Sequence, residues 1–249
     1  MTDTTETLEH LTTRIRSLAG GSTADLIGIA PGEAFGPEEL GELGAQFGPV
    51  RSVIVLAQHI VDPVQLVRFY AGGTYRDSRV VASFCDALLR DACWRVVEMV
   101  REAGYRAAVL RNQRYGVDDP RHGISYKKAG VLAGLGAFGK SQLLIHREWG
   151  PWVWLRAVVT DVQLPPDAPI DFSPCDGCSL CIAACPSGAL TEAGFDRAAC
   201  EGFYSAADLA RCGAGRISPL GRLDCAECVW ACPIGVAPPR LALGGNNDL

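Results

Sequence analysis

Four closely spaced cysteines constrain this chain more than any other feature. They follow the spacing C-x2-C-x2-C-x3-C, with a proline directly after the fourth, at Cys175, Cys178, Cys181, Cys185 and Pro186. This spacing is typical of [4Fe–4S] binding, in which three thiolates hold one cube and the fourth cysteine binds a second cube. The run therefore predicts two clusters, and it requires a second group of ligands elsewhere in the chain.

A second run does follow, with the spacing C-x2-C-x3-C-P, at Cys225, Cys228, Cys232 and Pro233. The same logic predicts that Cys232 completes the first cluster, together with Cys175, Cys178 and Cys181. The second cluster would take Cys185, Cys225 and Cys228, and it needs one more ligand. Cys200 is favoured because its segment could form a short turn beside the cluster, and Cys212, before a Gly-Ala-Gly loop, stays an alternative.

Zinc and disulfides are the other uses of such cysteines. Pairs spaced C-x2-C also bind zinc tetrahedrally, but the Cys-Pro endings and the x2-x2-x3 spacing favour iron–sulfur clusters. The chain has 11 cysteines, an odd number, and residues 1–9 are polar and acidic, unlike a secretory signal. Free thiols suit a reducing compartment, so we expect a cytoplasmic protein.

Composition sets limits on size and partners. A chain of 249 residues with 48% hydrophobic residues is long enough for one sizeable core and a small appended module. The net charge is −5 and no long basic run occurs, so nucleic acid is not an expected partner. The longest apolar stretches, around residues 53–56 and 152–155, are too short to cross a bilayer, so no membrane is expected either.

Hydrophobic periodicity predicts helices at residues 5–19, 79–103 and 125–133, and strands at 25–30, 52–57, 107–110, 143–146 and 152–160. Residues 162–174 contain four prolines and are interpreted as a linker. These elements predict an α+β domain over residues 1–170, followed by a ferredoxin-like two-cluster domain over residues 171–249. Cys85 and Cys93, within a predicted helix, are expected to be buried small hydrophobic residues.

A glycine-rich stretch, Ala133-Gly134-Leu135-Gly136-Ala137-Phe138-Gly139-Lys140, is the second informative feature. Its three glycines would let the backbone approach a flat or bulky ligand closely. The chain has only three lysines, Lys127, Lys128 and Lys140, and all of them border this stretch. The alternative is a glycine-rich turn with solvated lysines. The stretch does not match the phosphate-binding pattern G-x-x-x-x-G-K-[ST].

The combination of these features resembles a known family. The order AGLGxxGK, an LLI strand, a WGPW turn, an AVVTD strand, a proline-rich segment and a two-cluster module is similar to the epoxyqueuosine reductases and the reductive dehalogenases. The resemblance covers about residues 120–235 well and the first hundred residues only loosely. It implies a nitroreductase-like α+β domain that binds base-off cobalamin, with both clusters feeding electrons to cobalt.

The resemblance also implies roles for individual residues. Five residues of the glycine-rich stretch would contact the corrin: Gly134, Gly136, Phe138, Gly139 and Lys140. A single cysteine between the two runs completes the second cluster in that family, which supports Cys200. Dehalogenases use a tyrosine proton donor with a basic partner, which implies Tyr126 with Lys127 or Lys128 as the catalytic pair. The alternative is that Tyr126 is only a packed helix residue.

The chain also departs from this family. The acidic proton donor of epoxyqueuosine reductases aligns near Arg121, so Tyr126, His122 or Asp119 would have to replace it. The tRNA-binding helical region and the export leader of some relatives are not expected, and the cobalamin motif Asp-x-His-x-x-Gly is absent. The scattered histidines offer no obvious lower ligand to cobalt, and His59 and His146 are expected to be satisfied structural residues.

Together, these observations predict an iron–sulfur oxidoreductase. A ferredoxin or flavodoxin would supply low-potential electrons, and base-off cobalamin would reduce a small electrophilic substrate. Two other classes stay open. One is a corrinoid reducing or trafficking factor that acts on another protein's cobalamin. The other is a flavin-linked protein or a simple ferredoxin-type electron carrier.

Overall fold

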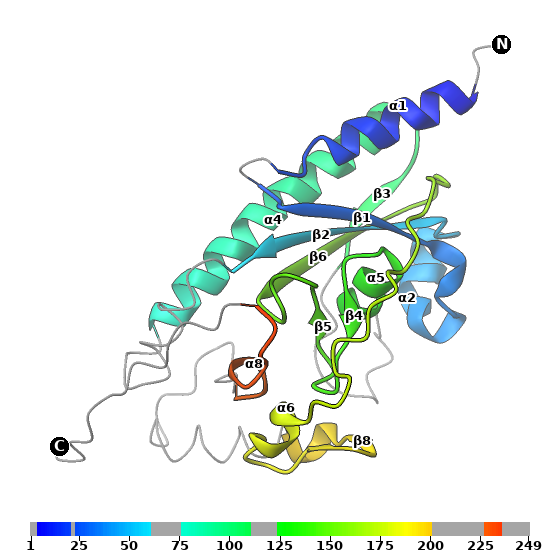
Figure 1. The fold of residues 1–249 in the computed structure, drawn as a ribbon. Coiled ribbons are helices and arrows are strands. Elements are labelled where there is room, and N and C mark those ends of the chain that lie inside the picture. Colours follow the sequence, from blue (N-terminus) through cyan, green and yellow to red (C-terminus); the bar gives the residue numbers. More distant parts are fainter. Residues whose placement is uncertain (1–3, 21–22, 61–75, 111–123, 201–226, 236–249) are drawn as a thin grey trace, which may run out of the picture. The chain divides into compact units, whose positions relative to one another are not determined.

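The computed structural model describes residues 4–20, 23–60, 76–110, 124–200 and 227–235 (Figure 1). The chain forms two compact units, each assembled from segments that are separated in the sequence. Unit one combines Met1–Ile60, Ala82–Ala137 and Val153–Phe172, and unit two combines Val61–Val81, Phe138–Trp152 and Ser173–Leu249. Residues 138–152 thus pack with the cysteine segments that follow them, although the sequence analysis counted them with residues 1–170.

Unit one is built on a four-stranded antiparallel sheet with the strand order β1-β2-β6-β3. The strands are β1 (Leu26–Pro31), β2 (Ser52–His59), β6 (Val153–Thr160) and β3 (Ala107–Val109). In the register, Ile54 of β2 lies opposite Ile29 of β1 and Val158 of β6. Residues 52–57 of β2 are all buried, which means that both faces of the sheet are covered at this strand. This explains why the strand reads as a continuous apolar run rather than an alternating one.

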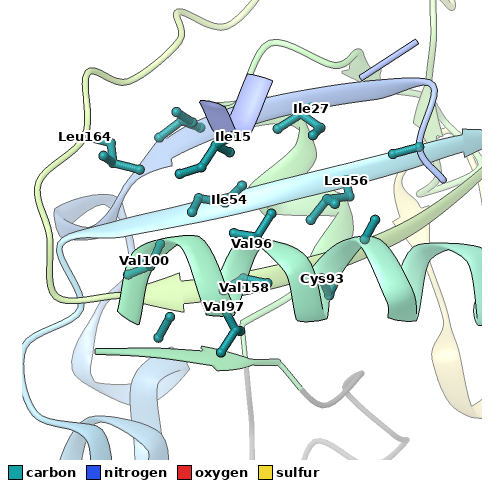
Figure 2. Packing of buried hydrophobic residues seen from close by; sticks show 14 of the residues in the cluster. Ile15, Ile27, Ile54, Leu56, Cys93, Val96, Val97, Val100, Val158 and Leu164 are labelled. Atoms are coloured by element: carbon teal, nitrogen blue, oxygen red, sulfur yellow. The ribbon is translucent and has the colours of Figure 1, made fainter. Parts of the chain in front are cut away.

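Two helices cover one face of this sheet, α1 (Thr4–Arg16) and α4 (Arg76–Glu102). The inward residues of α4 recur every three or four positions, as expected for an amphipathic helix. Figure 2 shows Cys93, Val96, Val97 and Val100 of α4 beside residues of the sheet, and all of them are buried. Cys85 is buried as well, so the structural interpretation of Cys85 and Cys93 is confirmed.

The opposite face of the sheet packs against α5 (Tyr126–Leu132). Gly28 lies between Ile27 and Ile29, whose side chains belong to the core on the α4 side. A Cβ atom at Gly28 would lie 2.3 Å from the carbonyl oxygen of Ala133, directly after α5. A glycine is therefore needed at this position of β1, because the end of α5 approaches the strand backbone too closely for any side chain.

The proline-rich segment is not a free linker. Its first part packs along β1, where Asp167 forms one backbone and one side-chain hydrogen bond with the backbone of Ile29. The N–H of Asp167 donates to the carbonyl oxygen of Ile29 at 2.8 Å, and the Asp167 carboxylate accepts from the N–H of Ile29 at 2.8 Å. Arg16 of α1 binds the same carboxylate at 2.8 Å, and Leu164 is buried in the core. The segment thereby covers the exposed edge of the sheet, a position that proteins commonly protect from unwanted pairing.

Every helix and strand expected from the sequence is present, with ends shifted by a few residues, so the mixed α and β fold class is confirmed. In unit one, the sequence analysis missed η1 (Gly32–Ala34) and α2 (Pro37–Phe47). It also missed β4 (Ala137–Phe138), whose two residues fall on either side of the boundary between the units. In unit two, beside the expected β5 (Leu144–Ile145), it missed α6 (Leu180–Ala183), β7 (Leu190–Thr191), β8 (Gly194–Phe195) and α8 (Glu227–Trp230). Among the described helices, none has the length and apolar character needed to cross a bilayer.

Candidate iron–sulfur site

Cysteines from both runs line one cavity of about 20 Å³ in unit two. Its wall contains Cys175, Cys178 and Cys181 from the first run, and Cys228 and Cys232 from the second. The two prolines that precede or follow these cysteines, Pro174 and Pro233, complete the wall together with Ser141 and Ile145. The structure thus brings together all four cysteines predicted for the first cluster, and it places Cys228 beside them.

The thiols in this cavity influence one another's ionisation. Burial raises the pKa of the Cys232 thiol, and the negative charge of Cys175, Cys178 and Cys181 raises it further. Burial likewise raises the pKa of Cys181, with added contributions from Cys175 and Cys178. Like charges within a few ångströms disfavour ionisation, so these effects mark four thiols that share one site.

A tight hairpin turn holds Cys175 in place. It connects β4 to β5, and the N–H of Gly139 donates to the carbonyl oxygen of Leu143 at 3.0 Å. Gln142 adopts a left-handed conformation with φ of 59°, which lets the chain turn within a few residues. The backbone N–H of Lys140 is directed out of the hairpin and donates to Sγ of Cys175 at 3.3 Å.

The Lys140 side chain also contacts the first cysteine run. Its ammonium group contacts the Glu192 carboxylate at 2.9 Å and the Ser179 hydroxyl at 3.0 Å. Ser179 lies within the first cysteine run, and its hydroxyl also donates to Glu192, in the turn between β7 and β8. Three separate segments of unit two are therefore joined beside Cys175 and Cys178.

Backbone contacts position the second cysteine run, and sequence reasoning missed them. A Cβ atom at Gly150 would lie 1.8 Å from the carbonyl oxygen of Ile234, and one at Gly235 would lie 2.4 Å from that of Trp149. The WGPW turn thus packs directly against the residues that follow Cys232. The sequence does contain a glycine in each of the two segments, one inside WGPW and one after Cys-Pro-Ile, and these glycines could have indicated a close backbone contact.

Aromatic contacts support the same turn. The Trp152 and Trp230 rings meet edge to face with centroids 4.6 Å apart, and Trp230 lies in α8 between Cys228 and Cys232. His146 stacks on Trp149 at 4.2 Å, and its Nδ1 accepts the backbone N–H of Trp149 at 3.2 Å. The expectation that His146 is a satisfied structural histidine is confirmed.

The predicted ligands of the second cluster are described only in part. Cys185 does not line the cavity, and its Sγ lies 3.5 Å from the Ser187 hydroxyl. Although burial opposes it, hydrogen bonds from Ser187 and from nearby backbone groups lower the pKa of the Cys185 thiol. Cys200 is partly buried, and its N–H donates to the carbonyl oxygen of Asp196. Cys225 and Cys212 lie outside the described residues, so the choice between Cys200 and Cys212 stays a prediction.

The proposed proton donor Tyr126 is part of the packing of unit one. Only 7% of the residue is exposed, and its hydroxyl donates to the carbonyl oxygen of Leu110 at 2.5 Å. Burial raises the pKa of Tyr126, which disfavours loss of its proton. This arrangement matches the alternative of a packed helix residue, and a catalytic role for Tyr126 and the half-buried Lys127 stays a prediction.

The predicted corrin contacts divide between the two units. Gly134 has a φ of 72°, ends α5 in a left-handed turn, and would place a Cβ atom 2.7 Å from the carbonyl oxygen of Ala168. Gly136 is buried in unit one. In unit two, Phe138 is 44% exposed, and a Cβ atom at Gly139 would lie 2.8 Å from Ile145. Contacts within the chain thus account for the glycines at positions 134 and 139.

Comparison with known proteins agrees with this site. Residues 168–191 match the 4Fe–4S binding domain family. The match contains the whole first cysteine run, from Cys175 to Cys185. An epoxyqueuosine reductase from Bacillus cereus is 43% identical over 83 residues, which cover 33% of this chain and 22% of the relative. A tetrachloroethene reductive dehalogenase from Desulfitobacterium hafniense is 34% identical over 107 residues, which cover 42% of this chain and 18% of the relative.

The fold resembles a solved structure as well. The structure of epoxyqueuosine reductase from Streptococcus thermophilus aligns with 94% of this chain and 66% of its own, with a TM-score of 0.54 and 16% identity. The resemblance to epoxyqueuosine reductases and reductive dehalogenases is thereby confirmed. Because the chain spans only 22% and 18% of the two curated relatives, their activities apply to it only as proposals.

The hairpin turn provides a first test of the site. In Gly139→Ala, the new methyl group would lie 2.8 Å from Ile145 and 3.4 Å from Sγ of Cys175. Such overpacking costs about 1–3 kcal/mol and should displace the turn from the cysteines, so we expect less iron in the anaerobically reconstituted protein. Gly36→Ala is the control, because its added methyl group meets nothing within 4 Å. Equal iron contents in the two variants would show that the turn does not support the site.

Proposed function

We propose that the protein is an iron–sulfur reductase that passes electrons through two [4Fe–4S] clusters to a base-off corrinoid, which reduces a small electrophilic substrate. The observation that carries this proposal is the cavity lined by Cys175, Cys178, Cys181 and Cys232. These four thiols would hold the first cluster. Cys185, Cys225, Cys228 and Cys200 would hold the second.

The cysteine spacing supports a cluster rather than zinc. C-x2-C pairs bind zinc tetrahedrally, but the x2-x2-x3 spacing and the Cys-Pro endings are typical of [4Fe–4S] binding. In a [4Fe–4S] cube each thiolate binds a different corner. Thiols from two separate runs that line one shared cavity fit that arrangement.

The corrinoid part of the proposal rests on the resemblance alone. When bound, a base-off corrinoid would supply low-potential cobalt chemistry for reduction of an epoxide, a halide or a comparable group. The glycines at positions 134 and 139 are already required by contacts within the chain, so they do not test this assignment. Phe138 is a predicted contact whose exposed ring can be tested separately, because 44% of the residue is accessible.

The proposed partners follow from the same reaction. A ferredoxin or a flavodoxin would supply low-potential electrons, and the substrate would be a small molecule or a corrinoid. We propose that the protein acts in the cytoplasm, without a membrane or a nucleic acid as partner. Tyr126 and Lys127 stay the proposed proton-donating pair, although the hydroxyl of Tyr126 is bound to Leu110 in this structure.

Metal content tests the two-cluster proposal. We expect about eight irons per chain after anaerobic reconstitution, because each of the two clusters contains four. Stoichiometric zinc with little iron would contradict the proposal. Cys200→Ser should remove one cluster, whereas Cys212→Ser should leave both clusters intact. If Cys212→Ser lowers the iron content and Cys200→Ser does not, the fourth ligand of the second cluster is Cys212.

Corrinoid binding tests the second part. We expect the reconstituted protein to bind cobalamin with its base displaced, which visible spectra detect. Phe138→Ala should weaken binding about two- to tenfold, because aromatic stacking contributes about 0.5–1.5 kcal/mol. Trp94→Ala is the matched control, because Trp94 is an exposed aromatic residue on α4 of unit one. Gly136→Leu should block binding while both clusters remain.

The same spectra separate the alternatives. Flavin bands would indicate a flavin-linked protein, and cluster bands alone would indicate an electron carrier. Reduction of the cobalamin carried by a separate corrinoid protein, without turnover of a small substrate, would indicate a reducing or trafficking factor.

A binding titration tests the partner proposal. Tight tRNA binding needs many phosphate contacts from basic residues, and this chain has a net charge of −5 and only three lysines. We expect no measurable filter binding of tRNA at physiological salt. Sub-micromolar binding that weakens as salt is added would instead indicate a tRNA substrate.

A further inference from the structure

Lys140 is the lysine that unit two places beside the first cysteine run. Its backbone N–H donates to Sγ of Cys175 at 3.3 Å, and its ammonium group is fixed by Glu192 at 2.9 Å and by Ser179 at 3.0 Å. The side chain of Lys140 is 31% exposed, so part of it is shielded from water. These contacts give the ammonium group a fixed position, unlike that of a freely solvated lysine.

The ion pair with Glu192 lies beside the first cysteine run. Lys140 contacts this run at two points, from its backbone N–H to Sγ of Cys175 and from its ammonium group to the hydroxyl of Ser179, which directly follows Cys178. Glu192 belongs to the turn between β7 and β8 and pairs with the ammonium group at 2.9 Å. The positive charge of Lys140 is therefore held next to the first cysteine run.

We propose that Lys140, held by Ser179 and Glu192, raises the reduction potential of the cluster at Cys175, Cys178, Cys181 and Cys232. This inference rests on the proposed function, because it requires a cluster at these thiols. Reduction adds one electron from the low-potential donor to the cluster, whose total charge becomes more negative by one. A nearby positive charge and hydrogen bonds to sulfur both stabilise that added charge, and these are the factors by which proteins adjust cluster potentials.

The assignment gives Lys140 a function that differs from the corrin contact implied by resemblance. The three segments that meet at the ion pair are the hairpin turn, the first cysteine run and the turn that contains Glu192. Because the fixing residues come from the cluster-binding region itself, the charge stays beside the cluster whether or not another cofactor is bound.

The test is an EPR-monitored redox titration of the reconstituted full-length protein with dithionite. In Lys140→Met, which keeps the length of the side chain but removes its charge, one cluster should titrate at a lower potential. We expect a shift equivalent to about a three- to tenfold change in the ratio of reduced to oxidised cluster, where tenfold is about 59 mV for one electron. The other cluster serves as an internal reference and should not shift.

Lys128→Met is the matched control. Lys128 is also partly exposed, at 37% of its side chain, but its ion pair with Glu39 at 2.7 Å and its hydrogen bond to the carbonyl oxygen of Ala34 involve no residue of the cysteine runs. This variant should leave both potentials unchanged. An equal shift in Lys128→Met and Lys140→Met would indicate a general effect of net charge and would overturn the inference.

Glu192→Gln keeps the inference testable if Lys140→Met assembles its clusters poorly. This change removes the negative partner and keeps the ammonium group, so the same cluster should titrate at a higher potential. No shift, or a downward shift, would contradict the proposed effect of this ion pair on the cluster.

Wild-type protein that binds no iron would refute the proposed function itself, whereas normal clusters with unchanged potentials in both variants would refute this inference alone.

Discussion

The crowding of cysteine thiols around one cavity is the constraint on which unit two depends. Burial raises the pKa of Cys181 and of Cys232, and the charges of neighbouring cysteines raise both further. Thiolates bind metals only when they are deprotonated, so the site can hold four of them only around a cationic centre. In the proposed cluster, iron binding would therefore be linked to the folding of this unit, because the iron would stabilise thiolates that are otherwise unfavourable beside one another.

The two units are stabilised by different interactions. Unit one has a hydrophobic core between the sheet and two helices, with residues such as Ile15, Ile54 and Val96 completely buried (Figure 2). The described parts of unit two contain short helices and two-residue strands instead. Their order comes from specific close contacts, such as Gly150 against Ile234 and the edge-to-face pair of Trp152 and Trp230. Small iron–sulfur modules have little apolar area to bury, so such contacts and the metal replace a core.

Local patterns in the sequence were sufficient to predict the core elements and which cysteines come together. The periodicity around Val96 and Val100 identifies α4, and the cysteine spacing grouped Cys175, Cys178, Cys181 and Cys232, which line one cavity. Long-range contacts could not be predicted in this way. Asp167 directly follows Pro165 and Pro166 in a segment whose sequence is typical of a loop, yet it binds Ile29, which is 138 residues away. α2 was missed because glycines lower its helix propensity, and Gly41 within it has a non-helical φ of 44°.

The glycine-rich stretch shows what a motif can and cannot establish. A glycine indicates that something approaches the backbone closely, but not what approaches it. At Gly134 the approaching group is the carbonyl of Ala168, and at Gly139 it is Ile145 with Cys175. The exposed ring of Phe138 lies two residues before Lys140, whose backbone N–H donates to Sγ of Cys175. If the electron acceptor binds at Phe138 as proposed, the turn beside the proposed first cluster would also position the acceptor, and a short stretch of backbone would separate the two redox centres.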